Sequence, residues 1–191
     1  MDVPRIVALA SDPRVSAFTL NLPYPYTERD AVYWLNLAEE GFRTGDRLIL
    51  AIRALGDDSL LGGISLTLTT SHRRAEIGYW LGYPSWSRGY VMEAVTALVA
   101  YSFTALKLYR LTSSHLAGNP ASGRVLQKAG LLYEGALKDH IYKAGNYHTL
   151  VLYGRVRTEL KQSLNVQPLL KRWESSCTDL RGSHKKNKCK S

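Results

Sequence analysis

The sequence predicts an α+β fold in which one mixed, mostly antiparallel sheet is flanked by helices. The main observation is the order of the segments. Three strand-like stretches occur in succession, and the third is followed by helix, strand, helix, strand and strand. The second observation is the length of 191 residues, which falls in the single-domain range and suffices to bury a sizeable core.

The N-terminal part predicts two helices. Apolar residues at helical spacing favour a helix over Val3–Ala10, which Pro13 interrupts. Thr27 is placed as an N-cap and Asp30 stands at the capping-box position. We therefore expect a second helix that begins after Thr27 and ends near Glu40.

The rest of the chain predicts the sheet and two further helices. Branched and aromatic residues indicate three strands, over Arg47–Ala54, Leu60–Thr69 and Ala75–Leu81. The helix over Pro120–Ala129 is supported by a proline in its first turn and a glycine just past its end. The later elements are a helix over Glu93–Leu106, a strand over Tyr109–Leu116, a helix over Pro120–Ala129, and strands over Leu131–Tyr142 and Tyr147–Arg157.

A glycine-containing loop before the first of these later helices is a candidate anion site. Arg88, Gly89 and Tyr90 stand directly before an apolar run that begins at Val91. The free N–H groups of a helix start, its dipole and a nearby arginine favour a phosphate. An ordinary turn is the alternative. The sequence contains neither the P-loop motif G-x-x-x-x-G-K-[ST] nor G-x-G-x-x-G, which argues against a P-loop NTPase and a Rossmann site.

Several motifs in this order resemble the GNAT superfamily of acetyl-coenzyme A-dependent N-acetyltransferases, in particular its RimJ/RimL branch of ribosomal-protein-alanine N-acetyltransferases. The resemblance covers roughly Asp2 to Glu159. The matching pieces are P-Y-P-Y-T (Pro23–Thr27), E-I-G-Y-W-L (Glu76–Leu81), W-S-R-G-Y-V-M-E-A (Trp86–Ala94), N-P-A-S-G-R-V-L-Q-K-A-G (Asn119–Gly130) and E-G-A-L-K-D-H-I-Y-K-A-G-N-Y-H (Glu134–His148).

The resemblance implies acetyl-coenzyme A as co-substrate and a direct transfer to an amine. Backbone N–H groups from Ser87 to Val91 would hold the diphosphate, helped by Arg88, for which a solvent-exposed arginine is the alternative. Asn119 would bond the pantetheine arm and Ser122 would face the thioester sulfur, the alternative being a helix cap. The full set of implied cofactor-binding residues is Trp80, Leu81, Trp86, Ser87, Arg88, Gly89, Tyr90, Val91, Asn119 and Ser122.

The residues that would bind or deprotonate the acceptor amine are less clearly indicated by the sequence. Glu76 is the best general base, because it alternates onto the face of Gly78 and Trp80, and a surface ion pair with a neighbouring arginine is the alternative. Glu134 is the second candidate. Tyr24 and Tyr26 would form a rim over the acceptor site, and an ordinary proline-stiffened loop is the alternative. His140 and Tyr142 could line the substrate groove, and packing is the alternative for both.

Two departures from the family pattern bear on function. The usual opening strand is absent from this sequence, so the next strand would expose its backbone edge. An exposed edge favours pairing with another chain. A monomer and a homodimer both remain open. Val91 places a branched side chain where the family has a small residue, which would weaken coenzyme A binding. The alternative function is therefore a degenerate, non-catalytic coenzyme A-binding or RNA/ribosome-associated protein.

The segment 161–191 differs from the domain over 1–160. From residue 171 onward it carries seven Lys and Arg against two acids, in a chain of net charge +9, and we expect a disordered tail. Contact with a ribosome or nucleic acid and a nuclear-localisation signal are the more specific functional interpretations of this tail. Both cysteines, Cys177 and Cys189, lie there without a metal pattern, so the folded part offers no acyl-cysteine.

Composition completes the expectations. No apolar run reaches the length of a membrane span and the N-terminus is a poor secretory signal, so a cytoplasmic protein is predicted. The sequence does not select the acceptor. A protein N-terminus, a polyamine, an aminoglycoside-like amine and another small amine all remain open.

Overall fold

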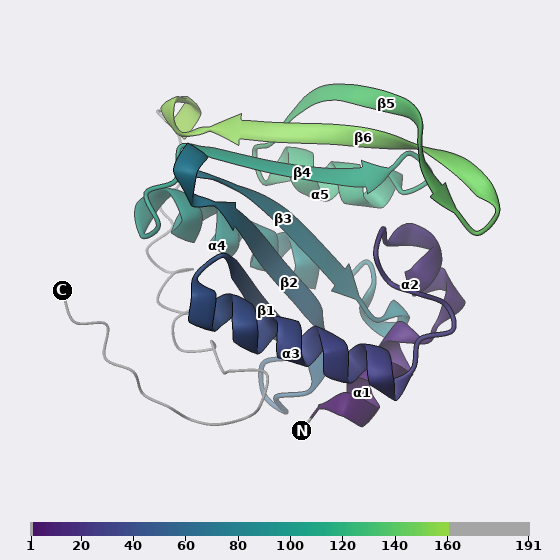
Figure 1. The fold of residues 1–191 in the computed structure, drawn as a ribbon. Helices are drawn as coiled ribbons and strands as arrows, with labels where there is room; N and C mark the ends of the chain where they lie inside the picture. The colour runs from purple at the N-terminus through teal and green to yellow at the C-terminus, as the bar shows by residue number, and fades with distance from the viewer. Residues whose placement is uncertain (1, 161–191) are drawn as a thin grey trace.

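A computed structural model describes residues 2–160, and the basic tail over 161–191 lies outside the described residues. One six-stranded mixed sheet is flanked by helices, with α1, α2 and α3 on one face and α4 and α5 on the other (Figure 1). This confirms the predicted fold class. The helices are α1 (Val3–Ala10), α2 (Pro13–Phe18), α3 (Glu28–Thr44), α4 (Tyr90–Thr104) and α5 (Pro120–Lys128). The strands are β1 (Arg47–Arg53), β2 (Leu60–Thr69), β3 (Arg74–Leu81), β4 (Arg110–Leu116), β5 (Leu132–Lys143) and β6 (Asn146–Val156).

The strands stand in the order β1-β2-β3-β4-β6-β5. All neighbouring pairs are antiparallel except β3 and β4, which are parallel and are joined through α4. A parallel pair needs such a crossover, because its second strand must begin at the same end of the sheet. The single parallel pair therefore places the start of α4 beside the carboxyl end of β3.

Two hydrophobic clusters hold the layers together. The larger lies between the sheet and α4 with α5, and Phe103, Leu98 and Leu111 are buried in it. The smaller lies on the opposite face, where Ile6 of α1 and Trp80 of β3 are buried. Burial of large apolar side chains on both faces supplies the main driving force for this layered arrangement.

Local capping signals explain where the N-terminal helices begin and end. The capping box of Thr27 and Asp30 is present at the start of α3. The predicted end near Glu40 is too early, because α3 runs to Thr44 and closes at Gly45, whose φ of 73° is left-handed. The break predicted at Pro13 also starts the short helix α2, whose cap Asp12 accepts a hydrogen bond from the Arg14 amide at 2.9 Å.

Strand β1 forms the edge of the sheet within residues 2–160, where no other strand pairs with its outer side. Among residues 2–160, β1 is the first strand along the chain. Across the same residues, no helix combines the length and the apolar character needed to cross a membrane.

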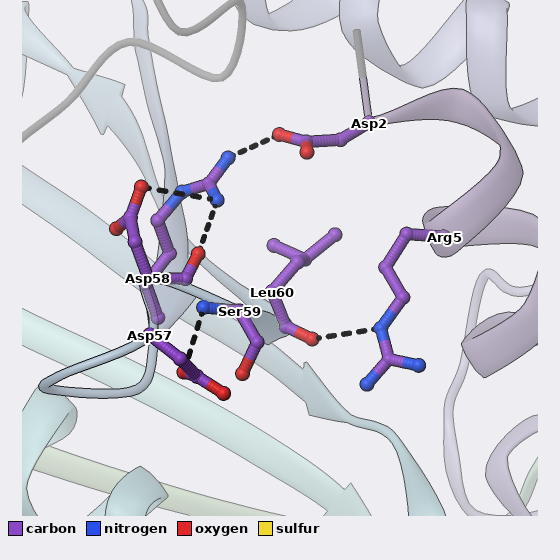
Figure 2. A network of polar contacts seen from close by, with 7 residues as sticks. Asp2, Arg5, Asp57, Asp58, Ser59 and Leu60 are labelled. Atoms are coloured by element: carbon purple, nitrogen blue, oxygen red, sulfur yellow. Dashed lines mark hydrogen bonds and ion pairs between the residues drawn. The ribbon is translucent and has the colours of Figure 1, made fainter.

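Polar contacts attach α1 to the turn between β1 and β2. Asp2 forms an ion pair with Arg53, and Arg5 Nε donates a hydrogen bond to the Leu60 carbonyl at 3.3 Å. Figure 2 shows Asp2 and Arg5 facing the turn from the same side. Arg53 also donates to the Asp58 carbonyl at 2.7 Å. The guanidinium side chain is only 13% exposed, so these partners compensate its desolvation.

We expect Asp2→Ala to lower the free energy of unfolding by about 1–3 kcal/mol, because it removes a charged partner from a largely buried arginine. Urea denaturation followed by circular dichroism measures the change. Glu40→Ala is the matched control. Its carboxylate lies 3.8 Å from Arg43 and is 68% exposed, so that pair contributes no more than about 1 kcal/mol. Equal losses in the two variants would contradict the anchoring role of Asp2.

Candidate active site

The parallel pairing of β3 and β4 stops before either strand ends. Backbone pairing joins Arg74–Ile77 to Arg110–Ser113, whereas β3 continues to Leu81 and β4 to Leu116. The last link is the Ser113 hydroxyl, which donates to the Ile77 carbonyl at 2.8 Å. Beyond this point the two strands diverge, and the backbone of β3 from residue 78 onward has no ladder partner on β4.

The divergence opens into a cavity of about 820 Å³. One wall is the end of β3 that has no partner on β4, residues 78–81, which we call the free end of β3. The other walls come from residues 113–115 of β4, from residues 18–22 at the end of α2 and beyond it, and from the starts of α4 and α5. Both faces of the sheet contribute, since Glu76 belongs to the face covered by α3, and Ser122 of α5 to the other. A cavity of this volume lies in the usual range for small-molecule and cofactor sites.

Trp86 anchors the loop that leads into α4. Its indole Nε1 donates to the Leu81 carbonyl at 2.7 Å, and its ring packs against Phe18 and Tyr83 at centroid distances of 5.9 and 5.3 Å. The loop therefore leaves β3 in a fixed direction. Trp86 and Leu81 both line the cavity, as predicted for the cofactor-binding set, but the Leu81 carbonyl already accepts this hydrogen bond.

The start of α4 faces the cavity without a side-chain cap. Gly89 is the N-cap, with a left-handed φ of 86° and no atom within 4 Å of the position that a side chain would occupy. Ser87 is also left-handed, with φ of 59°. Ser87, Gly89, Tyr90 and Val91 line the cavity, whereas Arg88 is exposed and does not line it. An uncapped helix start of this kind presents free N–H groups and a positive dipole end.

Asn119 combines a capping role with a place on the cavity wall. Its Oδ1 accepts from the Ser122 amide at 3.2 Å, and its Nδ2 donates to the Phe18 carbonyl at 3.3 Å. The capping contact agrees with the structural alternative for this residue. It is compatible with the predicted contact to a pantetheine arm, because Asn119 also lines the cavity.

Ser122 lies on the cavity wall and pairs with Tyr79, a residue of the motif Glu76–Leu81. Its Oγ lies 2.6 Å from the hydroxyl of Tyr79, which is also 3.3 Å from the Ser122 carbonyl. Burial raises the pKa of the Tyr79 phenol to about 12, so the group is protonated at neutral pH. Sequence reasoning assigned Tyr79 no role.

The two predicted carboxylates are in different situations. Glu76 is exposed, lines the cavity, and forms no ion pair with Arg73 or Arg74 within residues 2–160. Glu134 is instead ion-paired with Arg110. An unpaired carboxylate is free to accept a proton, so Glu76 remains the stronger candidate base.

The predicted aromatic groove residues do not gather around the large cavity. Tyr26 is 5% exposed in the smaller hydrophobic cluster, where burial raises its pKa to about 12. It is therefore no rim residue, because its ring completes the core beneath α1 and α3. Tyr24 lines a separate hollow beside Lys143. Tyr142 is exposed, packs on Tyr147 at 5.0 Å and lines neither hollow, so the structure does not bring it to the large cavity.

Lys143 attaches the β5–β6 hairpin to α2 and to the segment that walls the cavity. Its Nζ donates to the Ser16 carbonyl at 2.7 Å, to the Thr19 carbonyl, and to the Leu22 carbonyl at 3.4 Å. Burial lowers the pKa of this amine. The ammonium sits at the carboxyl end of α2, where a cation is favoured. Sequence reasoning missed this contact, which spans more than 100 residues of chain.

A family comparison decides what this architecture is. The model of the acetyltransferase (GNAT) domain matches residues 1–132. The chain belongs to the GNAT family. The resemblance deduced from the motifs is thereby confirmed. The GNAT match includes β3, the loop before α4 and the start of α5, which are the elements that wall the cavity.

Relatives of this GNAT chain carry ribosomal names, which agrees with the predicted branch. The protein named "Putative ribosomal N-acetyltransferase YdaF" of Bacillus subtilis (strain 168) is 38% identical over 106 residues, which are 55% of this chain and 58% of YdaF. The ribosomal-protein-serine acetyltransferase of Escherichia coli (strain K12) is 31% identical over 101 residues, 52% of this chain and 56% of that protein. The matches thus span little more than half the length of these relatives.

Solved structures share the GNAT fold. RimL, a ribosomal alpha-N-protein acetyltransferase in complex with coenzyme A, superposes with a TM-score of 0.74 at 20% identity, over 81% of this chain and 88% of RimL. A spermidine N-acetyltransferase from Vibrio cholerae, in complex with coenzyme A and spermine, gives 0.70 at 18% identity, over 82% and 90% of the two chains. At these identities the likeness concerns the fold alone.

We expect Lys143→Met to loosen the cavity wall. The variant keeps the length of the side chain but removes three hydrogen bonds to carbonyls of residues 16–22, so amide hydrogens of residues 13–22 should exchange about tenfold faster or more. Hydrogen-exchange mass spectrometry measures the effect. Lys138→Met, an exposed lysine on the same strand, is the matched control and should leave exchange unchanged. Unchanged exchange in Lys143→Met would remove the lysine from the support of α2.

Proposed function

We propose that this protein is an N-acetyltransferase that moves an acetyl group from acetyl-coenzyme A directly to a primary amine. The observation that carries the proposal is the divergence of β3 from β4. It opens one cavity between an uncapped helix start and the unpaired carboxylate of Glu76. A thioester threaded through such an opening would meet an amine that approaches from the other face of the sheet.

The residues present fit a nucleotide cofactor with an acyl arm. Free N–H groups at the start of α4 would hold the diphosphate, and the open space at Gly89 admits a close approach. From Gly78 to Leu81, β3 pairs with β2 on one side and has no ladder partner on the side of β4, and this open side would bond the pantetheine arm as a neighbouring strand does. Val91 lines the same cavity and packs partly against the core, so its branched side chain stands beside the proposed diphosphate site.

Two side chains would act on protons. Glu76 would accept the proton of the incoming ammonium, directly or through water, which frees the amine electron pair for attack. Ser122 would donate a hydrogen bond to the leaving sulfur, whose thiol has a pKa of about 8.5 in solution. Both cysteines of the chain lie beyond residue 160, so the described cavity offers no thiol for a covalent intermediate. Acetyl-coenzyme A supplies the activated acetyl group.

We infer a protein N-terminus as the acceptor. The two relatives with ribosomal names support this choice. The cavity wall agrees with it, because Glu76 is its one carboxylate among residues 2–160, and one carboxylate matches an acceptor with a single ammonium better than a polyamine. The non-catalytic alternative rests on Val91 and the open edge of β1. The open cavity and the unpaired carboxylate favour the enzyme.

A turnover screen tests the proposal. Acetyl-coenzyme A is offered with peptides that begin with serine or alanine, with spermidine and with an aminoglycoside, and release of free thiol is recorded. We expect turnover with the peptides. Tight binding of acetyl-coenzyme A without turnover of any amine would support the non-catalytic alternative.

Gly89→Asp should weaken binding of acetyl-coenzyme A at least about 100-fold in calorimetry, a loss of about 2.7 kcal/mol, because a carboxylate would face the phosphate site. Gly145→Asp is the matched control. Gly145 has a φ of 80° and open space, like Gly89 with 86°, but lies in the β5–β6 turn. Equal affinity in both variants would place the cofactor elsewhere.

Ser122→Ala should lower kcat by about 10²-fold while the affinity for acetyl-coenzyme A stays within about twofold, since the hydroxyl acts mainly on charge that develops at the sulfur. Steady-state kinetics and calorimetry measure the two quantities. If Ser122 only supports the start of α5, the variant will instead lose thermal stability and retain full rate per folded molecule.

A further inference from the structure

The hydroxyl of Tyr79 is the nearest polar partner of the Ser122 side chain. The two oxygens lie 2.6 Å apart, and either atom can be the donor. Tyr79 belongs to the free end of β3, beyond the point at which the pairing with β4 stops. A strand residue and a helix residue 43 positions apart thus meet at the cavity wall.

A count of protons separates two arrangements of this pair. Each hydroxyl has one proton, and a carbonyl oxygen can only accept. If Tyr79 donates to Ser122 Oγ, the serine proton is free to point at a ligand in the cavity. If Ser122 donates to Tyr79, the serine proton is used, and the only other protein acceptor for the phenol within residues 2–160 is the Ser122 carbonyl at 3.3 Å. That contact is longer than a normal O–H···O hydrogen bond.

Neighbouring contacts fix the helix that carries Ser122. Gly123 packs so closely on the sheet that an added Cβ would lie 2.8 Å from His115 Nε2 and 3.1 Å from the Tyr153 hydroxyl. Asn119 also accepts a hydrogen bond from the Ser122 amide at 3.2 Å. The serine hydroxyl therefore stands at a defined distance from Tyr79, and cannot drift with a mobile loop.

We propose that Tyr79 is a positioning residue for the leaving-group step. Its hydroxyl donates a hydrogen bond to Ser122 Oγ and so directs the serine proton at the leaving sulfur. This inference rests on the proposed function. As the carbon–sulfur bond breaks, the electron pair goes to sulfur, and the two hydroxyls stabilise it as a relay of hydrogen bonds. No proton has to leave the pair, because burial raises the pKa of Tyr79 to about 12, well above that of a thiol at about 8.5.

A double-mutant cycle with Tyr79→Phe and Ser122→Ala tests the proposal, because phenylalanine keeps the ring and removes only the hydroxyl. With acetyl-coenzyme A and a peptide that begins with serine, Tyr79→Phe should lower kcat about tenfold and leave cofactor affinity unchanged. The double variant should be no slower than Ser122→Ala alone, because Tyr79 acts through the serine. Effects that multiply, or a full rate in Tyr79→Phe, would overturn the inference.

The bound thiol gives a readout that does not depend on turnover. Coenzyme A bound to the wild-type protein should ionise at a lower pH than in Tyr79→Phe, as followed by the ultraviolet absorbance of the thiolate. Tyr109→Phe is the matched control, since it removes an exposed phenol that does not line the cavity and should leave the ionisation unchanged. Identical titrations of wild type and Tyr79→Phe would overturn the role of Tyr79.

The outcomes also separate this inference from the proposed function. A normal kcat in Ser122→Ala would overturn the leaving-group role of the serine and the positioning role of Tyr79 together. A slow Ser122→Ala enzyme beside a normal Tyr79→Phe enzyme would overturn the role of Tyr79 alone.

Discussion

The end of the β3–β4 ladder is the constraint on which the site depends. Ser113 donates to the Ile77 carbonyl at 2.8 Å and closes the paired part of the sheet, after which both strands continue apart. An unpaired strand backbone inside a protein is costly unless a partner or solvent satisfies it. Here the unpaired groups border a cavity of about 820 Å³. The opening thus leaves room beside β3, on the side away from β2, for the extended ligand proposed above.

The elements around the opening are each held by a contact of their own. Trp86 binds the Leu81 carbonyl and directs the loop toward the start of α4. Asn119 and Gly123 fix α5 against α2 and the sheet. Lys143 holds α2 from the far hairpin, whose tip curls toward that helix in Figure 1. A preformed site of this kind lowers the entropic cost of binding, because little of the wall must become ordered around the ligand.

Sequence patterns predicted what is local and missed what depends on distant packing. The bounds of β2 follow from alternation between turn signals, and the prediction of Leu60–Thr69 is confirmed. The end of α3 was misplaced because Gly41 reads as a terminator, although it is needed inside the helix, where an added Cβ would meet Arg47 at 2.5 Å. The loop at Gly89 and the position of Ser122 followed from motif order. The role of Tyr79 could not be predicted in this way, since its partner lies 43 residues away.

In the proposed function, a pantetheine-like arm occupies the divergence between β3 and β4. Hydrogen exchange with and without coenzyme A tests it most directly. We expect the ligand to slow exchange of amides in two segments, residues 78–81 of β3 and residues 87–92 at the start of α4. Protection confined to other segments, with the amides of residues 78–81 unchanged, would place the ligand elsewhere.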